Sequence, residues 1–94
     1  MAAPTIEMYT TTWCGYCERA RQLLRSKGAG FREISVEGQP EVRAEMIERS
    51  GRRTVPQIFI GTRHVGGSDE LAELDQAGEL DALLAGTDDK NLAI

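Results

Sequence analysis

The sequence is poor in the residues that build metal centres and disulfide frameworks. It has two cysteines and one histidine among 94 residues. A closed zinc site takes four ligands, mostly Cys and His, so one chain lacks the ligands for such a site. The two cysteines lie close together, and the disulfide loop they could form is too small to stabilise much of a fold. We therefore expect a reactive role for the cysteines rather than a structural one.

Long hydrophobic runs and an excess of positive charge are also missing. No apolar stretch approaches the roughly 20 residues of a transmembrane helix, and residues 1–8 lack the basic and apolar segments of a signal peptide. We expect no membrane association and a location in the reducing cytoplasm. The net charge of -4 argues against a nucleic-acid partner.

The length of the chain suits a single domain with one core. We expect residues 1–94 to form that domain, with a flexible tail over residues 86–94, and we expect a monomer. The pattern of apolar residues, glycines and prolines predicts an α/β fold, in which a small mixed sheet is flanked by helices. The predicted strands cover residues 6–9, 31–36, 54–60 and 63–65, and the predicted helices cover residues 15 to about 27, 40 to about 51, a segment with Ser68 as its N-cap and a segment after Gly78.

The segment Cys14-Gly15-Tyr16-Cys17 falls between the first predicted strand and the first predicted helix. A Cys-x-x-Cys motif in this position is typical of reversible thiol-disulfide chemistry. Two thiols at this spacing on the first turn of a helix face the same side and can form a disulfide. Unpaired N–H groups and the positive end of the helix dipole favour an anion there. We predict that Cys14 is the nucleophile and that Cys17 resolves the intermediate.

Three segments together resemble a glutaredoxin. They are Cys14–Cys17, then Thr54-Val55-Pro56, and then Gly66-Gly67-Ser68-Asp69, and the resemblance extends from Ile6 to Leu84. A Cys-x-x-Cys motif alone is shared with thioredoxins and metal sites, whereas three motifs in this order are specific. The chain looks most similar to the small dithiol glutaredoxins of bacteria. The resemblance implies a thioredoxin-like fold with a four-stranded mixed sheet.

The resemblance also implies a function and a set of binding residues. The function is glutathione-dependent reduction of protein-glutathione mixed disulfides and of protein disulfides, with glutathione as co-substrate and no tightly bound cofactor. Pro56 corresponds to a cis-proline that faces the cysteines, so that the Val55 backbone can pair with a substrate. The implied glutathione-binding residues are Tyr16, Arg43, Thr54, Val55, Pro56, Gly67, Ser68 and Asp69.

Three positions, Gly15, Thr11 and Ser68, depart from the family pattern, the last because some bacterial relatives have Cys there. Two alternative functions also stay open. Many dithiol glutaredoxins have Pro where this chain has Gly15, and some members with Gly or Ser there bind a [2Fe-2S] cluster between two subunits. A cluster carrier with Cys14 as a ligand is therefore one alternative. The family often has Lys where this chain has Thr11. The other alternative is a redoxin that takes its electrons from thioredoxin reductase.

Overall fold

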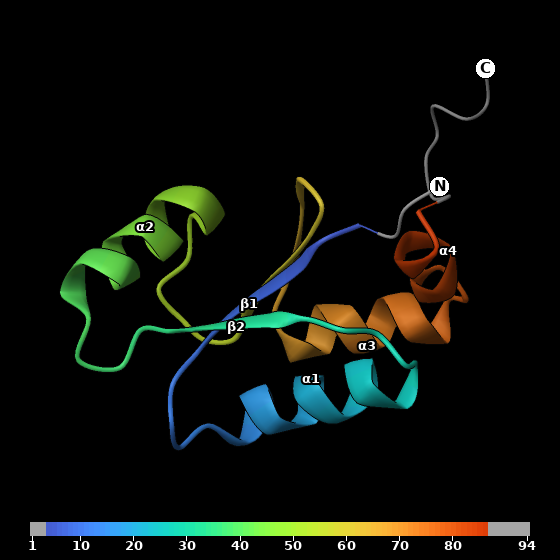
Figure 1. Cartoon of the computed structure of the whole chain (residues 1–94), viewed down its shortest axis with the longest axis horizontal. Coiled ribbons are helices and arrows are strands. Elements are labelled where there is room, and N and C mark those ends of the chain that lie inside the picture. The colour runs from blue at the N-terminus through green and yellow to red at the C-terminus, as the bar shows by residue number, and fades with distance from the viewer. Residues whose placement is uncertain (1–3, 87–94) are drawn as a thin grey trace.

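The computed structural model describes residues 4–86 and contains one four-stranded sheet with helices on both faces (Figure 1). The predicted fold class is therefore confirmed. Along the chain the elements are β1 (Ile6–Thr10), α1 (Gly15–Ser26), β2 (Arg32–Ser35), α2 (Pro40–Ser50), β3 (Gln57–Ile60), β4 (Arg63–Gly66), α3 (Ser68–Gln76) and α4 (Leu80–Leu84). No helix within residues 4–86 has the length and apolar character needed to cross a bilayer.

The sheet is mixed because its two halves are connected differently. The strand order is β2-β1-β3-β4. Strands β1 and β2 are parallel and are joined through α1, as a β-α-β unit requires. Strand β3 is antiparallel to β1 and to β4, and the β3–β4 turn contains Gly61 with a φ of 62°. A type II′ turn has a positive φ at the first of its two central residues and a negative φ at the second. Gly61 is the first and has the positive φ, whereas Thr62, like every non-glycine residue within 4–86, does not.

Side chains from the two faces of the sheet form two hydrophobic clusters. Ile6 and Met8 of β1 pack with residues of α1, α3 and α4, whereas Tyr9 packs with Met46 of α2. Successive side chains of a strand point to opposite faces, so β1 contributes to both clusters. Figure 1 shows α2 on one side of the sheet and α1 with α3 on the other.

Three sequence predictions need correction or fall outside the described residues. The predicted strand over 54–60 is shorter, since β3 begins at Gln57 and the Val55–Pro56 bond before it is cis. Ser68 is not the N-cap of α3: Gly67 takes that position and Ser68 is the first helical residue. Of the tail expected over residues 86–94, only Gly86 lies within the described residues.

Candidate active site

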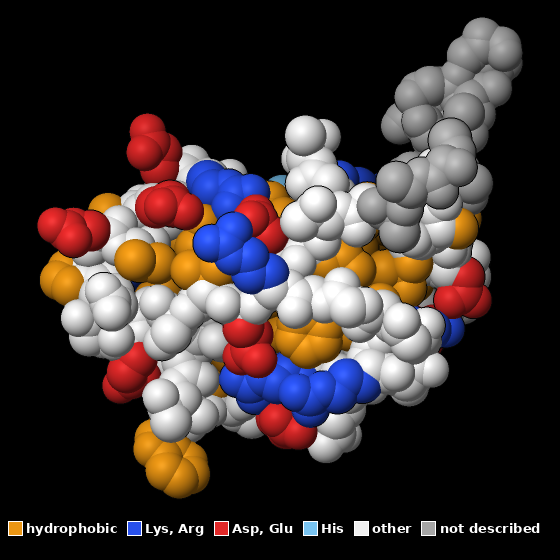
Figure 2. Space-filling model, in the orientation of Figure 1, with side chains coloured by type: hydrophobic (Ala, Val, Ile, Leu, Met, Phe, Trp, Pro, Cys, Tyr) orange, Lys and Arg blue, Asp and Glu red, His pale blue; other side chains and the backbone are white. Residues whose placement is uncertain are grey.

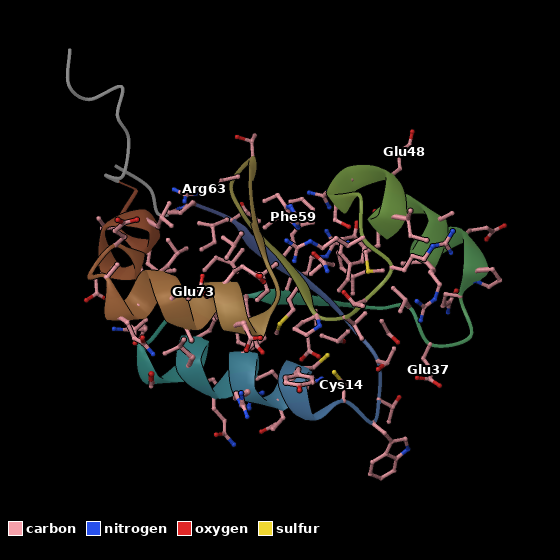
Figure 3. All side chains as sticks on the ribbon, turned by 180° about the vertical axis from the view of Figure 1, so that it is seen from behind. Cys14, Glu37, Glu48, Phe59, Arg63 and Glu73 are labelled. Atoms are coloured by element: carbon pink, nitrogen blue, oxygen red, sulfur yellow. The ribbon has the colours of Figure 1, made fainter. Side chains whose placement is uncertain are left out.

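The two cysteines lie at the start of α1 and have different surroundings. Cys14 is the N-cap residue, and its Sγ accepts a hydrogen bond from the Cys17 backbone N–H at 3.1 Å. Its side chain is partly exposed, whereas Cys17 has an exposed fraction of 0%. Figure 3 shows Cys14 at the N-terminal end of α1, at the same end of the molecule as Glu37. A reagent that approaches from solvent therefore reaches Cys14 first.

Burial changes the acidity of Cys17. Loss of solvent, a hydrogen bond with Cys14 and repulsion from Cys14 together raise the pKa of Cys17 to about 12, although a Thr11 backbone hydrogen bond and the charge of Arg21 act in the opposite direction. A thiol with such a pKa is protonated at neutral pH. Because only a thiolate attacks a disulfide, Cys17 is a poor nucleophile in the reduced protein.

A hollow with a volume of about 290 Å³ opens beside Cys14. The Cys14 Sγ lies 3.9 Å from the Val55 carbonyl oxygen, and Val55 lines the hollow. All the predicted glutathione-binding residues except Arg43 meet here. The lining consists of Tyr16, Arg52, Thr54, Val55, Pro56, Gly67, Ser68, Asp69 and Glu70.

The turn before α3 forms one wall of this hollow and is fixed by Glu70. The Glu70 Oε1 accepts a hydrogen bond from the Gly67 backbone N–H at 2.7 Å and lies 3.4 Å from the Arg52 Nη1. The Gly67 N–H is the main cause of the lowered pKa of Glu70. A carboxylate three residues after the N-cap is the second half of a capping box. Ser68 and Asp69 are thereby held at a helix N-terminus, which favours an anionic group.

Arg43 lies in a second hollow, with a volume of about 280 Å³, rather than in the first. Thr11 and Glu37 line the same hollow, and the Arg43 Nη1 donates a hydrogen bond to the Arg53 backbone carbonyl at 3.0 Å. Thr11 belongs to the segment that leads to Cys14, so this hollow also lies next to the active-site loop. The sequence analysis placed Arg43 among the binding residues but not Arg52, which lines the first hollow. Arg52 pairs with Glu70 of a distant segment, so no local pattern indicated its place.

Two arginines near the site are paired with carboxylates, so the positive charge around the site is interrupted. Arg21 contacts Glu18 and Glu33, and Arg52 contacts Glu70. On the face that Figure 2 shows, Lys and Arg side chains lie beside Asp and Glu side chains. The local charges therefore favour a ligand with both positive and negative groups over a simple polyanion.

The described residues of one chain do not form a site for a metal ion or an iron-sulfur cluster. Within residues 4–86 no group of three or more His, Cys, Asp or Glu side chains is placed to hold a metal ion. His64, the one histidine, forms a hydrogen bond of 2.7 Å with the Gln57 Oε1 and stacks on Phe59. Cys14 is therefore the one exposed sulfur ligand that the described part of this chain can offer.

Comparison with known proteins identifies the family. The family model described as Glutaredoxin matches residues 6–65. The chain belongs to the glutaredoxin family. It is 56% identical over 82 residues to a glutaredoxin of Pseudomonas aeruginosa, and the match covers 87% of this chain and 98% of that protein.

Solved glutaredoxin structures share the fold. The solution structure of glutaredoxin from Brucella melitensis is 53% identical with a TM-score of 0.81, and the match covers 93% of this chain and 94% of that chain. A crystal structure of a buckwheat glutaredoxin-glutathione complex is 32% identical with a TM-score of 0.81, and the match covers 89% and 79% of the two chains. As a glutaredoxin, the chain has the thioredoxin-like fold and is a thiol-disulfide oxidoreductase.

Proposed function

We propose that this glutaredoxin uses glutathione to reduce protein-glutathione mixed disulfides and protein disulfides. The observation that carries the proposal is the hollow beside Cys14, in which the Thr54–Pro56 segment faces the start of α3. Backbone N–H groups at that helix start, together with Asp69, suit the carboxylate and the amine of a γ-glutamyl group. The related buckwheat protein was crystallised as a glutaredoxin-glutathione complex.

The first reaction uses Cys14 alone. Its thiolate attacks the glutathione sulfur of a mixed disulfide, one S–S bond forms as the other breaks, and the substrate leaves as a thiolate. The hollow orients the tripeptide so that its sulfur lies in line with the Cys14 Sγ. A second glutathione then attacks the Cys14-glutathione disulfide and releases glutathione disulfide. Electrons balance, because one glutathione thiol is consumed and one substrate thiol is released as the mixed disulfide is exchanged for glutathione disulfide.

Reduction of a protein disulfide also requires Cys17. Once Cys14 is part of a mixed disulfide, it no longer carries the charge or the hydrogen bond that helps to raise the pKa of Cys17. Cys17 can then ionise more readily and attack the Cys14 sulfur. This attack releases the second substrate thiol and leaves a Cys14–Cys17 disulfide, which glutathione reduces. Formation of the intermediate thus activates the resolving thiol.

The test measures turnover of a glutathionylated peptide with glutathione, glutathione reductase and NADPH. We expect Cys14→Ser to abolish turnover and Cys17→Ser to retain it. With a protein disulfide as substrate, we expect both substitutions to abolish turnover. Activity retained by Cys14→Ser, or equal loss of both reactions in Cys17→Ser, would contradict the mechanism.

We further propose that glutathione reaches from the first hollow to the second, where Arg43 pairs with its glycyl carboxylate. Arg43→Ala should raise the KM for glutathione about tenfold, as expected for loss of an Arg-carboxylate contact, with little change in kcat. Arg32→Ala is the control, since Arg32 is exposed on β2 and pairs with Glu7. Equal KM values for wild type and Arg43→Ala would place the glycyl group elsewhere.

Two alternatives make different predictions in the same preparations. A redoxin coupled to thioredoxin reductase would turn over with that enzyme and fail with glutathione. A carrier of a [2Fe-2S] cluster would need Cys14 from two chains and glutathione thiols, so anaerobically purified protein would be coloured and dimeric and would lose its colour when glutathione is removed. We propose instead a monomer without a tightly bound cofactor, one functional domain over residues 1–94, working in the cytoplasm.

A further inference from the structure

The two exposed large hydrophobic side chains of the described residues lie on either side of the nucleophile. Trp13 directly precedes Cys14 and has an exposed fraction of 93%, and Tyr16 follows two residues later with an exposed fraction of 58%. Trp and Tyr are enriched in the central, buried part of protein interfaces. We propose that Trp13 is a docking residue for substrate proteins, and that it binds apolar side chains in an extended segment next to the target disulfide.

Trp13 is separate from the two hollows described above. Tyr16 lines the first hollow and Thr11 lines the second, but Trp13 lines neither. A tripeptide held in those hollows therefore leaves the indole free. A larger substrate, whose chain continues beyond the reacting sulfur, has atoms available to cover it. Trp13 should consequently distinguish protein substrates from small ones.

The loop that carries Trp13 is held in place although the indole itself is exposed. The Thr12 backbone N–H donates a hydrogen bond to the Glu37 Oε1 at 3.3 Å, and the Cys14 Sγ accepts one from the Cys17 N–H. Both chain neighbours of Trp13 are thus anchored before a substrate arrives. Docking on a preorganised loop costs less conformational entropy than docking on a loose one.

The surrounding geometry and charges favour an extended apolar segment. Val55 lies beyond the last β1–β3 pair, Tyr9–Gln57, and its carbonyl is 3.9 Å from the Cys14 Sγ, so an extended substrate can lie alongside this backbone. The Arg19 guanidinium lies 5.5 Å from the centre of the Tyr16 ring, and the Glu37 carboxylate accepts a hydrogen bond from the Thr12 N–H. Charges of both signs thus flank the Trp13 loop, so neither a basic nor an acidic segment is favoured over an apolar one.

Kinetic measurements with matched substrates test the proposal. They use two glutathionylated peptides, with Leu or Ser on both sides of the cysteine, and the small mixed disulfide of glutathione and mercaptoethanol. Trp13→Ala should lower kcat/KM for the Leu peptide about tenfold, the loss expected for truncating an aromatic interface residue. It should leave the other two substrates within a factor of about two, a difference well below 1 kcal/mol. Trp13→Phe should retain most of the kcat/KM for the Leu peptide. The control is Glu48→Ala, because Glu48 is exposed.

A uniform loss on all three substrates would instead indicate damage to the loop. An unchanged kcat/KM for the Leu peptide would also overturn the proposal. A third peptide, with Lys on both sides of the cysteine, tests for binding of cations. If Trp13→Ala lowers kcat/KM most for this peptide, the indole binds cations rather than apolar groups.

Fluorescence gives a second readout without altering Trp13, because the chain contains one Trp. Peptides carrying a thionitrobenzoate leaving group are joined to Cys14 of the Cys17→Ser variant, a disulfide exchange that releases thionitrobenzoate. The Leu peptide should shift the emission to shorter wavelength and protect the indole from acrylamide, whereas glutathione in the same linkage should do neither. Equal emission in both adducts would overturn the proposal. An emission shift that depends on protein concentration, without peptide, would show that a second copy covers Trp13.

The proposal rests on the role of Cys14 as the nucleophile, and the experiment separates the two. If Cys14 is not an activated thiol, the Cys17→Ser variant releases thionitrobenzoate no faster than free cysteine does. If Cys14 reacts but Trp13 does not dock, adducts form with unchanged emission.

Discussion

The Cys17 backbone N–H donates a hydrogen bond to the Cys14 Sγ at 3.1 Å, while the Cys17 side chain is fully buried. One residue thus stabilises negative charge on its partner's sulfur and hides its own sulfur from solvent. The order of events at the site follows from this arrangement. An external disulfide meets Cys14, and Cys17 can react only with a disulfide that Cys14 has already formed.

The two thiols should differ strongly in their reaction with iodoacetamide. In the folded, reduced protein near neutral pH, we expect modification of Cys14 and essentially none of Cys17, because burial raises the pKa of Cys17 to about 12 and blocks access. Peptide mass spectrometry after brief treatment measures both. In urea the two should react at similar rates, and equal modification in the folded protein would contradict this assignment.

The raised pKa of Cys17 also predicts a loss of stability at high pH. The unfolded chain releases the Cys17 proton near pH 9, but the folded protein keeps it up to about pH 12. The folded state therefore binds more protons in this window, and the free energy of unfolding falls as the pH rises through it. Cys14→Ser keeps the burial of Cys17, which is the largest cause of its raised pKa, but removes the effects of Cys14, so it should show part of this decline. The Cys14→Ser/Cys17→Ser double variant should show less. Urea denaturation across the window compares them, and parallel curves would contradict the prediction.

Glu70 should stabilise the turn that forms one wall of the first hollow. Glu70→Ala removes the acceptor of the Gly67 N–H and should lower the free energy of unfolding by about 1 kcal/mol, as for loss of a helix cap. Since the pKa of Glu70 is lowered, its carboxylate contributes stability above the ordinary pKa of about 4.3, and this contribution is lost as the pH falls through the lower folded value. Glu70→Gln should lose less stability than wild type on acidification. Identical acid denaturation of the two would argue against the cap.

Gly66 and Gly67 form a matched pair that tests the same turn. Gly66 has a φ of 117°, and an added Cβ would lie 2.9 Å from the Glu70 Oε1, so Gly66→Ala should cost about 1–3 kcal/mol of stability. Gly67 has a φ of -95°, and its added Cβ would be no closer than 3.4 Å to the same oxygen. Gly67→Ala should therefore cost less than Gly66→Ala, about 1 kcal/mol or less, because Ala is a poorer N-cap residue than Gly. Thermal unfolding ranks the pair, and a reversed order would show that the turn is built differently.

Hydrogen bonds of Tyr9 should attach α2 to the sheet. The buried Tyr9 hydroxyl donates to Glu45 and accepts from the Arg49 Nη1 at 2.9 Å. Tyr9→Phe removes both bonds and should lower the free energy of unfolding by about 1–2 kcal/mol. Tyr16→Phe is the control, because Tyr16 is exposed. If both variants unfold at the same urea concentration as wild type, α2 is held by its hydrophobic contacts alone.

The sequence predicted the elements whose signals are local. Pro40 begins α2, Gly51 ends it with a positive φ of 73°, and Ala20 and Leu24 are buried at helical spacing on α1. Such features depend on residues a few positions apart, which a single sequence contains. The resemblance to glutaredoxins predicted, in addition, that three distant segments form one site, and these segments line or adjoin the first hollow.

The rest depended on contacts between distant segments. Ser68 is a better intrinsic N-cap than Gly67, yet Glu70 caps the helix one residue earlier and also contacts Arg52 of another segment. The separation of Arg43 from the first hollow depends on how α2 lies against the sheet. The sequence also did not predict that Trp13 is exposed, because a Trp close to a strand is ordinarily expected to be mostly buried.

Gly15 should be replaceable by Pro with a gain in stability. It is the first residue of α1, where Pro is well accommodated because the N–H at that position has no partner within the helix. Apart from its chain neighbours and the nearby backbone of α1, no atom of the described residues lies within 4 Å of an added Cβ. Gly15→Pro should raise the free energy of unfolding by about 0.4–1 kcal/mol, since it restricts the unfolded chain. Urea denaturation of reduced protein measures the effect, with Gly15→Ala as the variant that keeps the N–H. A loss of stability with Pro but not with Ala would show that the Gly15 N–H has a partner in the folded protein, and that the loop around Cys14 depends on it.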